Sequence, residues 1–100
     1  DYPDYAKLLS DKLKIDHNSQ GILFCGTGIG ISMAANRYSH IRAALCTTAE
    51  MASKSRKHNN ANVLALGGRI ITDSLATDIV NEFLNTDFEA GRHSLRVNKI

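Results

Sequence analysis

The stretch Gly21–Asn36, with the sequence GILFCGTGIGISMAAN, decides the fold. Its run Ile22–Phe24 is continuously apolar, which predicts a short strand buried on both faces of a parallel sheet. Cys25 ends that strand, and three alternating glycines follow it before a helix that we expect to begin near Ile29. Because such a turn carries few side chains, its unpaired backbone N–H groups can bind an anion beside the Cys25 thiol.

The position of Cys25 indicates a reactive thiol. A helix N-terminus or a nearby cation can lower a thiol pKa from about 8.5 into a range of about 3.5 to 7.5. A buried structural cysteine is the alternative, but a glycine-rich loop packs poorly and favours a ligand site. Two familiar phosphate loops do not fit, since no Gly-Lys-Ser/Thr is present and a dinucleotide fingerprint needs glycine where Ile31 stands.

Composition narrows the class of protein. The 100 residues are 43% hydrophobic with a formal net charge of +2, which predicts one small soluble domain and argues against a nucleic-acid partner. No apolar run reaches the roughly 18 residues of a membrane span. Two cysteines without a CxxC pattern favour the cytoplasm. We expect no metal site, because the four histidines lack close ligand spacing: His17, His40, His58 and His93.

Helix and strand patterns alternate along the chain. An N-terminal covering helix is expected from Pro3 to Asp16, with four apolar side chains at helical spacing: Tyr5, Leu8, Leu9 and Leu13. The run Ile41–Cys46 predicts a second buried strand. Thr47 and Thr48 can then cap a helix that ends near His58 and places Met51 and Ala52 in the core.

A third strand, Val63–Leu66, is closed by two glycines. Thr72 and Asp73 cap the most clearly amphipathic helix, whose apolar face comprises Leu75, Ile79, Val80, Phe83 and Leu84. This alternation predicts an α/β fold, a doubly wound, Rossmann-like parallel sheet with flanking helices.

Ligands of such sheets gather at the carboxyl ends of the strands, where Cys25 and Arg69 are expected. His58 ends a helix that leads into a strand, so its side of the sheet stays open. Arg92 and Arg96 are four residues apart and share a helix face, where they repel one another unless an anion lies between them. A solvated basic face is the alternative for these two arginines.

Five segments together resemble ribose-5-phosphate isomerase B, within the sugar-phosphate isomerase family that includes the galactose-6-phosphate isomerase subunits. They span almost the whole chain: DYPDYA, CGTGIGISMAANR, IRAALC, SRKHNNANVLALGGR and GRHSLRV. The cysteine of CGTG distinguishes the chain from the galactose-6-phosphate subunits.

The resemblance implies an enzyme that interconverts D-ribose 5-phosphate and D-ribulose 5-phosphate in the pentose phosphate pathway, through a cis-enediolate. Cys25 would be the base that moves the proton, Thr27 would assist it, and His58 would open the sugar ring as acid/base. The implied substrate-binding groups are the backbone amides of Gly26, Thr27, Gly28, Ile29 and Gly30, and the side chains of Asn59, Arg69, Arg92 and Arg96. Preorganised donors of this kind suit the negative charge of an enediolate. The resemblance implies no metal and no organic cofactor.

The resemblance also implies a homodimer, or a dimer of dimers, with an active site shared between chains. The family has an N-terminal strand and helix before the position of Asp1, so we expect residues 1–100 to form a single, N-terminally incomplete isomerase domain. Two alternatives stay open: an isomerase of a six-carbon sugar phosphate such as allose 6-phosphate, and a non-catalytic phosphosugar-binding protein.

Overall fold

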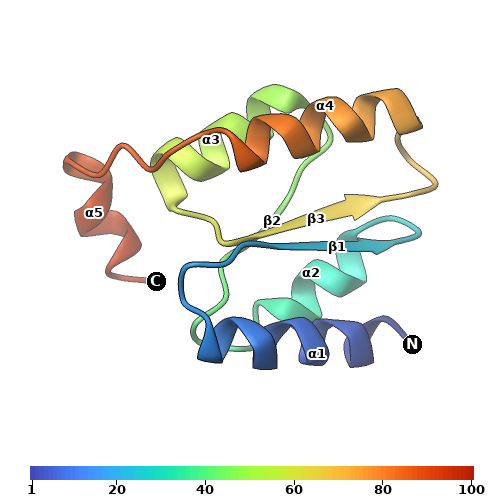
Figure 1. The fold of residues 1–100 in the computed structure, drawn as a ribbon, viewed down its shortest axis with the longest axis horizontal. Coiled ribbons are helices and arrows are strands. Elements are labelled where there is room, and N and C mark those ends of the chain that lie inside the picture. The colour runs from blue at the N-terminus through green and yellow to red at the C-terminus, as the bar shows by residue number, and fades with distance from the viewer.

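A three-stranded parallel sheet with the strand order β1-β3-β2 organises the chain (Figure 1). The computed structural model describes all of residues 1–100. The strands are β1 (Gly21–Cys25), β2 (Ala43–Leu45) and β3 (Val63–Gly67). The helices are α1 (Tyr2–Ile15), α2 (Ile29–Ala35), α3 (Ala49–Asn59), α4 (Asp73–Leu84) and α5 (Arg92–Val97). The predicted α/β class with a parallel sheet is confirmed.

Helices cover both faces of the sheet, which makes three layers. In Figure 1, α1 and α2 lie on one side of the strands and α3 and α4 on the other, while α5 lies beyond the amino ends of the strands. Each face has its own apolar core. One is centred on Leu23, Ile31 and Val63, and the other on Leu64, Ile79 and Phe83. Because side chains of a strand alternate between faces, β3 supplies both cores and is buried along its whole length.

Two helix starts that the sequence predicted are confirmed by their caps. The Thr48 hydroxyl accepts the Met51 N–H at 3.1 Å, and the Thr72 hydroxyl accepts the Leu75 N–H at 3.1 Å. Each hydroxyl satisfies a backbone donor that the first helical turn leaves unpaired. At the other end of α3, Asn60 adopts a left-handed conformation with φ of 48°, which ends the helix.

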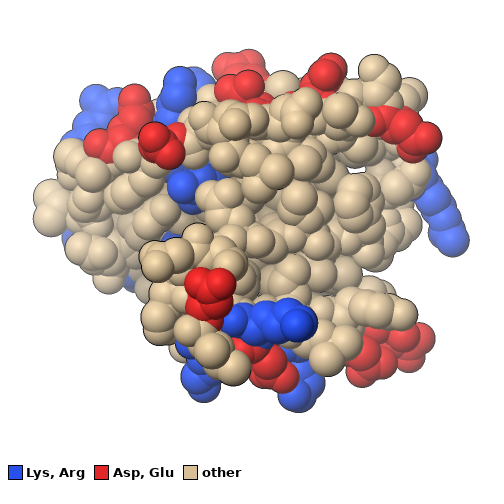
Figure 2. Space-filling view, viewed as in Figure 1, with Lys and Arg blue, Asp and Glu red and all other residues tan.

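The prediction that β1 is buried on both faces is wrong. Phe24 is 53% exposed and Ile22 is partly exposed, because β1 is an edge of the sheet and α4 lies over the central strand. Figure 2 shows charged side chains along the two helical layers of this face and few in the middle, where β1 runs in Figure 1. The strand that fits the prediction is β3.

Some predicted core positions are also exposed. Met51 is 43% exposed because it lies in the first turn of α3, whereas Ala52 is buried against the sheet as expected. Tyr5 and Leu8 point away from the sheet, since α1 buries Ala6, Ser10 and Leu13 instead. In the predicted face of α4, only Leu84 is largely exposed. The second strand is shorter than predicted, although its flanking residues Ile41 and Cys46 are buried. No helix has the length and apolar character to cross a membrane.

Candidate active site

The Cys25 thiol lies at the carboxyl end of β1, where the chain turns into α2. The Gly28 N–H donates to Cys25 Sγ at 3.1 Å, so the turn aims a backbone dipole at the sulfur. Burial by itself raises the pKa of Cys25. Hydrogen bonds from the backbone of Ile31, Gly28 and Thr27, and from the Thr27 side chain, outweigh burial and hold that pKa below its ordinary value. The predicted activation of this thiol therefore has a structural cause.

The second cysteine has the opposite environment. Cys46 is almost fully buried, and burial raises the pKa of its thiol, although a hydrogen bond with Ser55 opposes the rise. Both thiols are free. Only Cys25 combines access to solvent with donors that favour the thiolate.

Two glycines leave no space for a side chain at the turn that follows Cys25 (residues 26–30), which we call the thiol turn: Gly28 within it and Gly67 on the neighbouring strand. Gly28 has φ of +80°, and a Cβ there would lie 2.5 Å from Leu45 Cδ1 and 2.9 Å from the Leu66 carbonyl carbon. A Cβ on Gly67, at the end of the neighbouring strand, would lie 2.5 Å from the Thr27 carbonyl oxygen. These short distances show that the thiol turn packs closely against β3, which restricts the conformation of the turn.

Arg69 joins the thiol turn, as the sequence predicted. The Gly68 N–H donates to the Cys25 carbonyl at 2.8 Å, and the Arg69 N–H donates to the Gly26 carbonyl at 2.9 Å. A Cβ on Gly26 would lie 3.4 Å from one terminal nitrogen of Arg69, so the guanidinium lies directly over that glycine. The structure thus brings together a thiol, a hydroxyl and a cation at one edge of the sheet.

Thr27 contacts the backbone of the same turn, because its Oγ1 accepts the Ile29 N–H at 3.2 Å. The ring of Tyr2 covers Gly30, where an added Cβ would lie 2.7 Å from Cζ of the ring. Sequence reasoning did not place Tyr2 at the site. The only indication in the sequence was that Tyr2 belongs to the segment DYPDYA, which resembles the family. That resemblance does not indicate which side chain of the segment reaches the turn.

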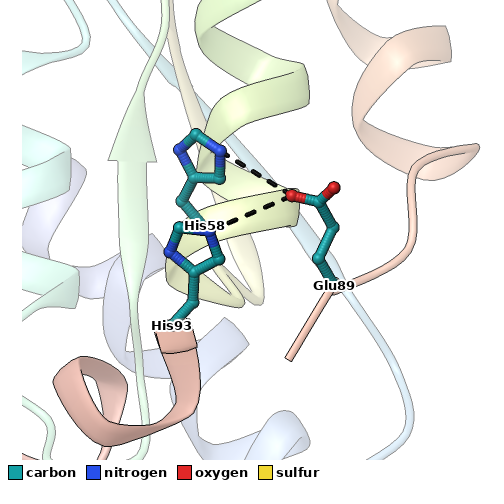
Figure 3. Close-up of side chains that lie close together, drawn as sticks. All are labelled: His58, Glu89 and His93. Atoms are coloured by element: carbon teal, nitrogen blue, oxygen red, sulfur yellow. Dashed lines mark ion pairs between the residues drawn. The ribbon is translucent and has the colours of Figure 1, made fainter. Parts of the chain in front are cut away.

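A second cluster, which we call the histidine pair, consists of His58 at the end of α3 and His93 in α5, with Glu89 beside both rings (Figure 3). The two rings stack with centroids 4.3 Å apart and an interplanar angle of 17°. Glu89 Oε1 lies 3.8 Å from His58 Nε2 and 4.0 Å from His93 Nε2. Sequence analysis treated the histidines as scattered and missed this cluster, whose members are distant in sequence or joined by a loop.

The histidine pair is poorly arranged for a shared metal ion. Its three ligand atoms lie within 4.8 Å of one another. However, an imidazole nitrogen binds a metal along its in-plane lone pair, and nearly parallel rings direct their lone pairs side by side rather than at one point. Two cations, Arg92 and Arg96, belong to the same short helix as His93.

His93 has a lowered pKa. Burial of the ring is the main cause, and the positive charges of His58 and Arg92 add to it, whereas Glu89 opposes the shift. The lowered pKa favours the neutral form of the His93 ring, so the structure disfavours two imidazolium rings in contact.

The two groups of predicted site residues lie at opposite ends of the sheet. Cys25 pairs with Gly67 at the carboxyl end of β3, whereas α3 ends beside Val63 at the amino end of that strand. Four residues of strand separate these ends by about 13 Å. Thr27 and Arg69 belong with Cys25, whereas Arg92 and Arg96 belong with His58. Within one chain, His58 does not reach the thiol.

Asn59 lies at the end of the sheet that carries His58 and opens onto a hollow of about 470 Å³. Arg42, Ala44 and Ile100 also line this hollow, which does not include Cys25. None of the residues that line this hollow belongs to the thiol turn.

Comparison with known proteins gives one consistent result. The model of the family described as Ribose/Galactose Isomerase matches residues 1–100. The ribose-5-phosphate isomerase B of Escherichia coli K12 is 45% identical over 100 residues, which are the whole of this chain and 67% of that protein. The probable ribose-5-phosphate isomerase B of Mycoplasma genitalium is 48% identical over 101 residues, covering 100% of this chain and 66% of that protein.

Solved structures agree with this result. The ribose 5-phosphate isomerase of Thermotoga maritima superimposes with a TM-score of 0.96 at 54% identity, over 99% of this chain and 68% of that one. The ribose-5-phosphate isomerase B of Mycoplasma genitalium with bound ribulose-5-phosphate gives a TM-score of 0.95 at 48% identity, over 99% of this chain and 66% of that one. The chain thus spans about two thirds of the length of these relatives.

Proposed function

The chain belongs to the ribose/galactose isomerase family, and on that premise we propose that the protein interconverts D-ribose 5-phosphate and D-ribulose 5-phosphate. The observation that carries this proposal is the thiol turn. Cys25 combines a lowered pKa with a backbone donor on its sulfur and with Arg69 close by. A base of this kind, beside groups that stabilise oxygen anions, suits proton transfer next to a carbonyl.

In the proposed reaction, the Cys25 thiolate removes the proton from C2 of the open-chain aldose. The electrons of that C–H bond form the C1–C2 double bond, and the C1 carbonyl oxygen becomes an enediolate oxygen. The thiol then returns the proton to C1. The C2 hydroxyl loses its proton as the ketone forms at C2, and the C1 oxygen gains a proton, so that C1 ends as an alcohol. Thr27 assists by its hydrogen bond to the sulfur, which stabilises the thiolate. His58 acts earlier, as the acid/base that opens the sugar ring.

The proposed active site is completed by a second copy of the chain. His58 and the thiol lie at opposite ends of a strand that is buried along its whole length, so no side-chain rotation joins them. In a two-fold homodimer, the thiol end of one chain can face the histidine end of its partner, and the same contact repeats at the second site. Arg92 and Arg96 would then bind the phosphate from the partner's side, with Asn59 near the enediolate.

Complementation between two inactive variants tests the reaction and the assembly together. Full-length Cys25→Ala and His58→Asn proteins should each have no more than trace activity on ribose 5-phosphate. After unfolding and refolding as a mixture, half of the dimers contain both variants, and each of these has one intact shared site. About one quarter of the wild-type rate should return. Recovery of no activity would refute the shared site.

Wild-type full-length protein that fails to convert ribose 5-phosphate would refute the proposed activity itself. Parallel assays with allose 6-phosphate test whether the substrate is a six-carbon sugar phosphate instead. We also propose a cytoplasmic location, because the reactive thiol is unpaired and needs a reducing compartment.

A further inference from the structure

The histidine pair contains two groups that the proposed reaction does not use, Glu89 and His93. The loop that carries Glu89 is fastened to α3 at two places. The Arg56 guanidinium donates through Nε to the Thr86 carbonyl at 3.0 Å, and the Glu89 N–H donates to the Lys57 carbonyl at 3.1 Å. The carboxylate is therefore held beside the last turn of α3, next to the residue that precedes His58.

The chain then turns sharply into α5. Ala90 and Gly91 both have positive φ, 58° and 55°, and the His93 N–H donates to the Ala90 carbonyl at 3.0 Å. A positive φ is unfavourable for alanine, so this turn is held by its surroundings. The turn brings the ring of His93 into parallel contact with the ring of His58.

The orientation of the two rings relative to Glu89 is specific. Figure 3 shows the Nε2 atoms of both rings directed toward the Glu89 carboxylate, with the other ring nitrogens directed away. An ionised carboxylate accepts hydrogen bonds and does not donate them, so it favours a proton on Nε2. The lone pair of a neutral ring is then left on Nδ1, which is the atom available to a substrate.

We propose that Glu89 is a positioning residue for His58, which holds the proton of this imidazole on Nε2 and leaves Nδ1 as the base for ring opening, while the stacked ring of His93 fixes the plane of the imidazole. This inference rests on the proposed function. Opening of the sugar ring moves one proton. The hydroxyl on C1 loses it as the carbonyl forms, and the ring oxygen gains it as the C1–O bond breaks.

Nδ1 of His58 can perform both transfers in turn, and the ring is unchanged at the end. Between the two transfers the ring is an imidazolium, which the carboxylate of Glu89 stabilises at 3.8 Å from Nε2. In this proposal the Glu89 carboxylate orients the imidazole of His58 without taking its proton.

The test compares Glu89→Gln and Glu89→Asp with Glu50→Gln in the full-length enzyme. Glu50 is the matched control, since it is an exposed acidic residue at the other end of α3. For Glu89→Gln, kcat on the cyclic sugar should fall roughly 10- to 100-fold, a part of what acid–base catalysis contributes. KM should change less than about threefold, and proton exchange on substrate supplied in open-chain form should be preserved. Glu89→Asp should recover part of the loss.

Nitrogen-15 NMR of the imidazoles gives a readout that does not depend on activity. His58 should be the Nε2–H tautomer in the wild-type protein and in Glu50→Gln, and a mixture of tautomers in Glu89→Gln. An unchanged tautomer in Glu89→Gln overturns the proposal, whatever the rates. Equal losses on the cyclic and open-chain substrates also overturn it. If the wild-type enzyme does not act on ribose 5-phosphate, the proposed function fails, and the tautomers still decide whether Glu89 positions His58.

Discussion

Replacement of Gly28 by alanine should distort the thiol turn and destabilise the protein. Two costs add at this position. A left-handed backbone costs a residue with a Cβ about 1 to 2 kcal/mol. The new Cβ would lie 2.5 Å from Leu45 Cδ1 and 2.9 Å from the Leu66 carbonyl carbon, and overpacking of this kind costs about 1 to 3 kcal/mol. The free energy of unfolding should therefore fall by about 2 to 5 kcal/mol.

The matched control is Gly68→Ala, in the loop that lies against the same turn. Its Cβ would lie 3.8 Å from the Cys25 carbonyl oxygen, an ordinary contact, and its φ is not positive. Unfolding free energy should change by less than about 1 kcal/mol, and a small gain is possible because alanine restricts the unfolded chain.

Urea unfolding of the two variants measures the difference, and alkylation of Cys25 at pH 7 shows its effect on the site. Gly28→Ala should slow alkylation, because the amide that donates to the sulfur moves and the pKa of the thiol rises. Equal losses of stability in both variants would refute the argument from backbone conformation. Unchanged alkylation in Gly28→Ala would refute the role of its N–H in activating the thiol.

Three other predictions follow from the same geometry. Alkylation of Cys25 should reach half its maximal rate at a lower pH than alkylation of Cys46, because only the thiolate reacts and the two pKa values are shifted in opposite directions; coincident pH profiles would contradict this. Arg92→Ala should raise KM for ribose 5-phosphate by an amount equivalent to about 1.5 to 3 kcal/mol, with little effect on turnover of unphosphorylated ribose, and equal effects on both sugars would mean that the arginine is structural. Arg56→Met should lower the unfolding free energy by about 2 to 4 kcal/mol in a urea titration, because the nearly buried guanidinium donates to the carbonyls of Thr86 and Ala61; a loss below about 1 kcal/mol would show that water replaces it.

The parts of the fold that the sequence predicted well are those determined by local chemistry. Thr48 and Thr72 act as helix caps through contacts three residues away, and a Cys-Gly turn after an apolar run specifies its own conformation. The burial of individual side chains was predicted less well, because it depends on which elements pack beside them in the folded chain. Phe24 belongs to an apolar run that resembles β3, yet its strand lies at the edge of the sheet, and nothing local distinguishes the two.

The residues of the candidate site also divide into those that the sequence predicted and those whose position depends on distant contacts. Cys25 and Arg69 were predicted to lie at the same edge because parallel strands bring their carboxyl ends together. Thr27 was implied only by the family resemblance. The histidine pair depends instead on a loop that leaves α4, is fastened to α3 and reverses at Ala90. A contact between Glu89 and His58 spans more than thirty positions, and the glutamate has no motif of its own that sequence reasoning could recognise.

Topology also explains why the two groups of candidate site residues lie at opposite ends of the sheet. In a parallel sheet, each helix returns the chain from the carboxyl ends of the strands to their amino ends. A residue in the loop after a strand is therefore at the thiol edge, whereas a residue at the end of a helix, such as His58, is at the other edge. β3 joins the two edges and is buried along both faces, so the separation is as rigid as the core itself. If the proposed reaction is correct, the chain cannot bring its own acid/base to its own thiol without unfolding that strand, and association with a second chain is then part of the chemistry.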